Sequence, residues 1–157
     1  MLRVSRSITR AVGAAGAALL LAGVGSSSAV ATSAQKVPLT ETNRDCDGSV
    51  IGDEDPAGFG FVVFNVTGSN QLVAQLVVKG AEPNAEYGVR VIQVPDTATG
   101  DCGDFRGPYE AYLTTDADGN ANANVHEMLI DGASGAFVAL NKTDAASTEY
   151  FTTAPSA

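Results

Sequence analysis

The segment Asp116–Glu127, which reads DADGNANANVHE, has the spacing of a twelve-residue calcium loop. Side chains with oxygen ligands stand at positions 1, 3, 5, 9 and 12: Asp116, Asp118, Asn120, Asn124 and Glu127. Position 6, where such a loop needs glycine for its sharp turn, is Ala121. The alternative is a β-hairpin whose turn uses Asp, Gly and Asn for their backbone tolerance, and we favour the hairpin.

A second group of carboxylates surrounds the two cysteines, Cys46 and Cys102. If these cysteines were bonded, four acidic residues would come together: Asp45, Asp47, Asp101 and Asp104. Several carboxylates on loops are suitable ligands for Ca²⁺. Arg44 and Arg106 lie in the same segments, so the alternative is a pair of solvated loops with ordinary surface ion pairs. We favour the solvated loops.

Few residues in this chain could support catalysis. His126 is the only histidine, so a zinc site lacks ligands and a catalytic triad would depend on His126 alone. Neither Ser134 nor Ser147 lies in a nucleophile elbow. The chain has no tryptophan with which to stack sugars. We therefore expect no enzyme activity and no cofactor.

The N-terminal segment 1–31 is predicted to be a signal peptide. Three arginines precede the apolar stretch 11–24, and Ala29-Val30-Ala31 is a small-x-small cleavage site. Removing 31 of the 157 residues leaves 126, with six basic and 18 acidic residues and a balance of −12. Such a charge repels nucleic acid and anionic lipid. We expect a secreted protein with no membrane attachment after cleavage.

The mature chain is expected to form one domain, 32–157, with residues 32–35 disordered. Short runs with period-two alternation or β-branched residues predict strands in eight places: 36–40, 58–66, 71–79, 86–94, 109–115, 121–125, 135–140 and 149–153. The alternation also predicts which side chains share a face of their strand: Phe59, Phe61 and Val63; Leu72, Leu76 and Val78; Tyr87, Val89 and Val91; and Ala121, Ala123 and Val125. Seven or eight short strands separated by turn signals are typical of an antiparallel β-sandwich. Export favours one disulfide, Cys46–Cys102, which would tie down a long loop at 95–108.

Two motifs resemble a known class of protein. The stretches KGAEPNAEYGVRV and YLTTDADGNANANV are similar to the core of secreted bacterial immunoglobulin-like modules. They also resemble, more weakly, the neocarzinostatin-like apoproteins that carry enediyne chromophores. The matching segment, 76–125, covers less than half of the mature chain, and that family has two short-range disulfides where this chain has two cysteines. The resemblance implies an immunoglobulin-like sandwich and, for the second family, a ligand-carrying function.

Three functions are compatible with these features. The first, which we favour, is a non-catalytic, monomeric interaction module that binds an unknown protein or small molecule through its surface. The second is a carrier of a small apolar ligand, with ligand contacts expected at Phe105, Tyr109, Ala121 and Ala123. The third is a calcium-stabilised extracellular module that uses the two groups of carboxylates described above.

Overall fold

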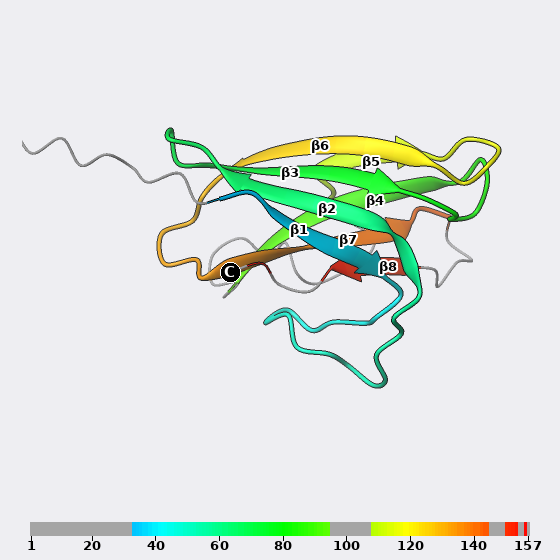
Figure 1. Ribbon diagram of the computed structural model, residues 1–157, viewed down its shortest axis with the longest axis horizontal. Helices are drawn as coiled ribbons and strands as arrows, with labels where there is room; N and C mark the ends of the chain where they lie inside the picture. Colours follow the sequence, from blue (N-terminus) through cyan, green and yellow to red (C-terminus); the bar gives the residue numbers. More distant parts are fainter. Residues whose placement is uncertain (1–32, 95–107, 145–149, 154–155, 157) are drawn as a thin grey trace, which may run out of the picture.

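The computed structural model describes residues 33–94, 108–144, 150–153 and 156 of the chain. Within them lie eight β-strands (Figure 1): β1 (Gln35–Thr40), β2 (Gly58–Val66), β3 (Gln71–Val78), β4 (Glu86–Val94), β5 (Ala111–Thr114), β6 (Ala121–Met128), β7 (Gly135–Lys142) and β8 (Tyr150–Thr153). All eight strands were predicted from the local pattern, with small differences at their ends. The predicted signal peptide and the loop 95–107 lie outside the described residues.

The strands form a single sheet in the order β5-β4-β7-β8-β1-β2-β3-β6, and every pairing is antiparallel. The sheet curls into a nearly closed barrel, so the predicted two-sheet sandwich is wrong. The reason is strand β1, which pairs with β2 along one edge and with β8 along the other. The β1–β8 pairing is short, with Leu39 opposite Thr153 and Thr40 opposite Thr152, but it joins what would otherwise be two sheets.

The predicted disulfide does not appear in the fold as described. Cys102 lies outside the described residues, so no disulfide joins two residues of the described part of the chain. Cys46, the described cysteine, is not a free thiol. In the described part of the chain, strand pairing and side-chain contacts close the barrel.

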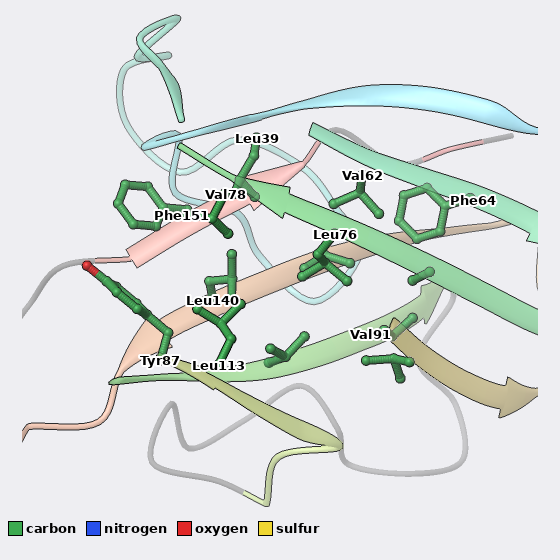
Figure 2. Packing of buried hydrophobic residues seen from close by; sticks show 14 of the residues in the cluster. Leu39, Val62, Phe64, Leu76, Val78, Tyr87, Val91, Leu113, Leu140 and Phe151 are labelled. Carbon is green, nitrogen blue, oxygen red and sulfur yellow. The ribbon is translucent and has the colours of Figure 1, made fainter. Parts of the chain in front are cut away.

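The core fills the inside of the barrel, and the alternation of each strand decides which side chains enter it. Tyr87, Val89 and Val91 of β4 all point inward and are almost completely buried, as their period of two predicted. Strand β3 contributes Leu72, Leu76 and Val78 in the same way. Figure 2 shows how Tyr87 and Phe151 pack at one end of this core, with their ring centroids 5.7 Å apart.

Strand β2 departs from simple alternation at Gly60. The sequence predicted that Phe59, Phe61 and Val63 share one face, but only Phe61 and Val63 do so. Gly60 has a φ of +119°, which reverses the alternation and turns Phe59 onto the core, 4.5 Å from the ring of Phe151. A Cβ on Gly60 would lie 1.9 Å from the carbonyl oxygen of Val77, so only glycine fits there.

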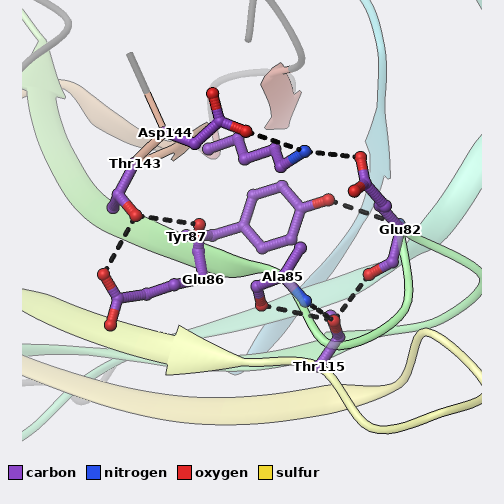
Figure 3. A network of polar contacts seen from close by, with 8 residues as sticks. Glu82, Ala85, Glu86, Tyr87, Thr115, Thr143 and Asp144 are labelled. Atoms are coloured by element: carbon purple, nitrogen blue, oxygen red, sulfur yellow. Dashed lines mark hydrogen bonds and ion pairs between the residues drawn. The ribbon is translucent and has the colours of Figure 1, made fainter. Parts of the chain in front are cut away.

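Tyr87 also anchors the turn that precedes β4. Its hydroxyl accepts a hydrogen bond from the backbone N–H of Glu82, five residues upstream, at 3.3 Å (Figure 3). This is the arrangement of a tyrosine corner, in which a buried ring carries its polar atom back to the chain that enters the strand. The sequence motif around Tyr87 thus corresponds to a real structural device, although the sheet as a whole is not a sandwich.

The strand directions bring the loops 41–57, 79–85 and 115–120 and residues 143–144 to one end of the barrel. This end carries 11 of the 14 acidic residues in the described part of the chain: Glu41, Asp45, Asp47, Asp53, Glu54, Asp55, Glu82, Glu86, Asp116, Asp118 and Asp144. We call it the acidic end. The negative charge of the chain is therefore concentrated at one end of the barrel.

Candidate binding face

The turn between β5 and β6 uses its first carboxylate to hold its own backbone. Asp116 Oδ1 accepts hydrogen bonds from the N–H groups of Asp118 at 2.9 Å and of Asn120 at 2.8 Å. The bond from Asn120 is the main cause of the lowered pKa of Asp116. These contacts are those of a hairpin turn, the interpretation that we favoured. Glu127, the last ligand of the calcium alternative, lies about 23 Å away along the strand, near the far end of β6.

The acidic loop after β1 uses its carboxylates in a similar way. Asp45 Oδ1 accepts from the N–H of Cys46 at 2.7 Å, and Asp47 Oδ1 accepts from the N–H of Ser49 at 2.8 Å. Hydrogen bonds from Ser49 lower the pKa of Asp47. Asp101, the other predicted ligand, lies outside the described residues. In the part of the chain that the structure describes, no three His, Cys, Asp or Glu residues are arranged to hold a metal. Calcium binding stays a prediction.

Sequence analysis missed the ion pair between Lys142 and Glu82 at the acidic end, because these residues are 60 positions apart in the chain. Lys142 Nζ lies 2.6 Å from Glu82 Oε2 and 3.2 Å from Asp144 Oδ2. The hydrogen bond to Glu82 is the main cause of the raised pKa of Lys142. A lysine held in its protonated form between two carboxylates is a poor nucleophile, so we assign it a structural role.

Two threonines complete this network by bonding to the backbone (Figure 3). Thr115 Oγ1 donates to the carbonyl oxygen of Glu82 at 2.6 Å and accepts from the N–H of Ala85 at 2.9 Å. Thr143 Oγ1 donates to the carboxylate of Glu86 at 2.9 Å. The polar groups at this end of the barrel thus hold the turns together.

His126 lies on the outside of β6 and is exposed. Its Nδ1 is 3.4 Å from Oε1 of Gln71 on the neighbouring strand. Of the two serines considered as nucleophiles, Ser134 bonds the carbonyl oxygen of Val94 through its Oγ, and Ser147 lies outside the described residues. The absence of catalysis remains an expectation.

The residues predicted to contact a carried ligand do not come together. Ala121 and Ala123 pack against the core of the barrel. Tyr109 lies on the outside, where its ring covers Gly88 closely enough that a Cβ there would be 2.4 Å from it. The same ring meets Tyr112 edge-on, with centroids 5.4 Å apart. Phe105 lies outside the described residues, so the carrier function stays a prediction.

One face of the barrel offers a different kind of surface. The register of β1, β2, β3 and β6 determines which of their side chains share the outer face of the barrel. On this face Phe61 is opposite Val77, and Gln75 lies between Val63 and Asn124. We call this the amide face. Its members are Lys36, Pro38, Phe61, Val63, Asn65, Gln71, Val73, Gln75, Val77, Asn122, Asn124, His126 and Met128.

The amide face contains no carboxylate, although the chain as a whole has a net charge of −9. Phe61, Val63 and Val77 form an apolar patch on this face and are half-buried, and Gln75 lies opposite Val63. Around them stand exposed amide side chains and, at one corner, Lys36, whose Nζ lies 3.8 Å above the ring of Phe61. Sequence reasoning identified the strands but missed this face, because its composition appears only when four strands are placed in register.

Comparisons with known proteins identify no relative: no family model, curated protein or solved structure matches the chain. Within the described residues there is no helix long and apolar enough to cross a membrane.

Proposed function

We propose that the protein is a non-catalytic binding module that contacts another protein through the amide face. The observation that carries this proposal is the composition of that face, which has an apolar patch, exposed amides and no carboxylate in an acidic chain. Protein interfaces are depleted of acidic side chains, because charged groups are costly to desolvate within a contact.

The size of the amide face suggests a transient contact. Four strands about 4.8 Å apart and about 26 Å long present roughly 500 Å² to a partner. Stable complexes bury about 800 Å² on each side, so we expect weak binding. The face is rigid because it lies on strands, which limits the conformational entropy lost on association. We infer a partner whose contact surface is itself flat, weakly charged and partly apolar.

Site-directed photocrosslinking in the producing culture tests this proposal. A photoreactive residue replaces Gln75 at the centre of the amide face or, as a control, Thr114, which is exposed on β5 and is not part of the amide face. We expect one discrete protein adduct from position 75 and none from position 114. The adduct should disappear when Val63→Lys is added, because Val63 is opposite Gln75 in the register. Adducts from both positions, or from neither, would contradict the proposal.

A further inference from the structure

His126 is the only histidine of the chain, and the fold places it on the amide face. It lies on β6, in one row with Val73 of β3 and Asn65 of β2. The spacing of strands and residues puts it roughly 8 Å from Gln75, where we expect the partner to bind. A partner seated over Gln75 therefore also covers His126.

The side chain of His126 is exposed, and one of its two ring nitrogens already has a neighbour. Its Nδ1 lies 3.4 Å from Oε1 of Gln71. An amide oxygen only accepts hydrogen bonds, so this contact forms when Nδ1 carries the hydrogen. In the neutral ring Nε2 is then an acceptor that a partner can use. A proton on Nε2 adds a positive charge and turns this acceptor into a donor.

The strands next to His126 provide no carboxylate to compensate that charge. Strand β3, its hydrogen-bonded neighbour, has no ionisable side chain. Strand β5, which also contacts β6, has only that of Tyr112, and a tyrosine hydroxyl is uncharged at acid and neutral pH. Glu127, the other charged residue of β6, alternates with His126 and so points to the opposite side of the strand, where its Oε2 lies 3.3 Å from Nε2 of Gln93.

The charged groups of the more distant strands do not compensate it either. Strand β4 reaches β6 through Gln93, but its charged residues, Glu86 and Arg90, hydrogen-bond side chains at the end of β7. Lys36 carries the fixed charge of the amide face and lies three strands from β6. It is roughly 16 Å from His126 along the sheet, whereas charges are screened over about 8 Å at physiological ionic strength.

We propose that proton uptake by His126 regulates the amide face, so that the protein binds its partner at neutral pH and releases it at mildly acid pH. This inference rests on the proposed function, because the switch acts on binding through that face. An uncompensated charge is costly to bury in a contact, so the proton binds the free protein more tightly than the complex. By linkage the affinity falls as the pH falls, by at most about tenfold per pH unit because one proton is involved.

The fold itself should not respond to pH in the same range. The lowered pKa of Asp116 means that its contribution to stability is lost only below about pH 4. His126 is exposed, so its protonation in the free protein buries no charge. A change in binding between about pH 7.5 and about pH 5.5 therefore reports on the amide face, and circular dichroism at both pH values verifies that the fold is intact.

The photocrosslink at Gln75 tests the switch when it is performed at two pH values. The protein with the photoreactive residue is titrated into supernatant of the producing culture, adjusted to about pH 7.5 or about pH 5.5. The measured quantity is the protein concentration that gives half-maximal adduct. For the wild type we expect this concentration to be about tenfold higher at the acid pH, which is the effect of one histidine that is protonated only in the free protein.

Two variants identify His126 as the group that titrates. His126→Gln takes up no proton, so the ratio of its half-maximal concentrations at the two pH values should be about 1, whatever its absolute affinity. His126→Lys is charged at both pH values. Its ratio should also be about 1, but it should bind about tenfold more weakly than the wild type already at neutral pH.

A wild type with a ratio near 1, or one that binds more tightly at acid pH, would overturn the inference. A His126→Gln variant with the same ratio as the wild type would overturn it too, since the titrating group would then lie elsewhere. In each of these cases the adduct still forms, so the proposed function stands. The absence of an adduct from position 75 at both pH values contradicts the proposed function and the switch together.

Discussion

The side-chain amide of Gln93 bonds the backbone of Ile130 and thereby bridges β4 to the chain that leaves β6. The N–H of Ile130 lies 2.9 Å from Gln93 Oε1, and Gln93 Nε2 bonds the carbonyl oxygen of Met128 in return. This contact is needed because β5 pairs with only the first half of β4. On the same edge of β4, the carboxylate of Glu110 accepts from the N–H of Val91 at 3.2 Å. Side chains thus close the barrel where strand pairing ends.

Replacing Gln93 by leucine should destabilise the protein although leucine has a similar size. The variant leaves the carbonyl oxygen of Met128 and the N–H of Ile130 without their partner in a region where Gln93 is only 4% exposed. We expect a loss of about 2–3 kcal/mol in the free energy of unfolding, measured with urea. The control Gln75→Leu, on an exposed position of β3, should change it by less than about 0.5 kcal/mol. Equal effects of the two changes would show that the bridge is unimportant.

The hydroxyl of Tyr87 should contribute measurably to stability. Tyr87→Phe keeps the buried ring and removes the acceptor of the Glu82 N–H, so we expect a loss of about 1 kcal/mol. Thermal unfolding measures this loss. Tyr112→Phe is the matched control, because Tyr112 is 60% exposed and should tolerate the change within about 0.5 kcal/mol. An unchanged stability in Tyr87→Phe would mean that the corner is held by packing alone.

Gly60 should tolerate no side chain. In Gly60→Ala the new Cβ meets the carbonyl oxygen of Val77 at 1.9 Å, and its φ of +119° is itself unfavourable for alanine. We expect a loss of more than about 2 kcal/mol. Gly58→Ala, two residues earlier in β2, meets nothing within 4 Å and should be nearly neutral. Denaturant unfolding of both variants gives the comparison, and a neutral Gly60→Ala would contradict the described backbone of β2.

The carboxylate of Asp116 should make stability depend on acid pH. Its pKa in the folded protein is lowered from a usual 3.8, mainly by the hydrogen bond from the Asn120 N–H. A lowered folded pKa stabilises the protein above the unfolded pKa, and this contribution is lost as the pH falls through the folded pKa. We therefore expect unfolding to become easier below about pH 4.

Asp116→Asn isolates this contribution. The variant should show a smaller fall in stability between about pH 4 and pH 2 than the wild type, because asparagine does not titrate. Chemical-shift titration of the Asp116 carboxyl gives its pKa directly, and a value at or above 3.8 would disprove the role of the turn hydrogen bonds.

Most of the strands and their inward faces followed from the sequence, because alternation is a local property. Leu72, Leu76 and Val78 were predicted to share a face and do so in the core. The same holds for Ala121, Ala123 and Val125 of β6, which line the inner side of the barrel. The turn at Asp116 was also predicted correctly, because side-chain oxygens bond the backbone two to four residues on, within the same segment.

Where the backbone departs from ideal alternation, the sequence was less informative. Phe59 was predicted beside Phe61, yet Gly60 reverses its direction and places it on the core. Glycine permits such a conformation but does not require it, so the presence of glycine at position 60 does not determine which way the side chain of Phe59 points. The contact that decides it, with the carbonyl oxygen of Val77, comes from the neighbouring strand.

The sequence by itself thus determined an all-β chain, its strands and its tight turns, since each depends on residues close together in the chain. Only the tertiary structure decided that β1 joins β8, so that one nearly closed sheet replaces the expected sandwich. It also brought Lys142 to Glu82 and assembled the amide face from four strands. These features depend on pairings between distant segments, and a strand's own side-chain pattern is the same whichever neighbour it has.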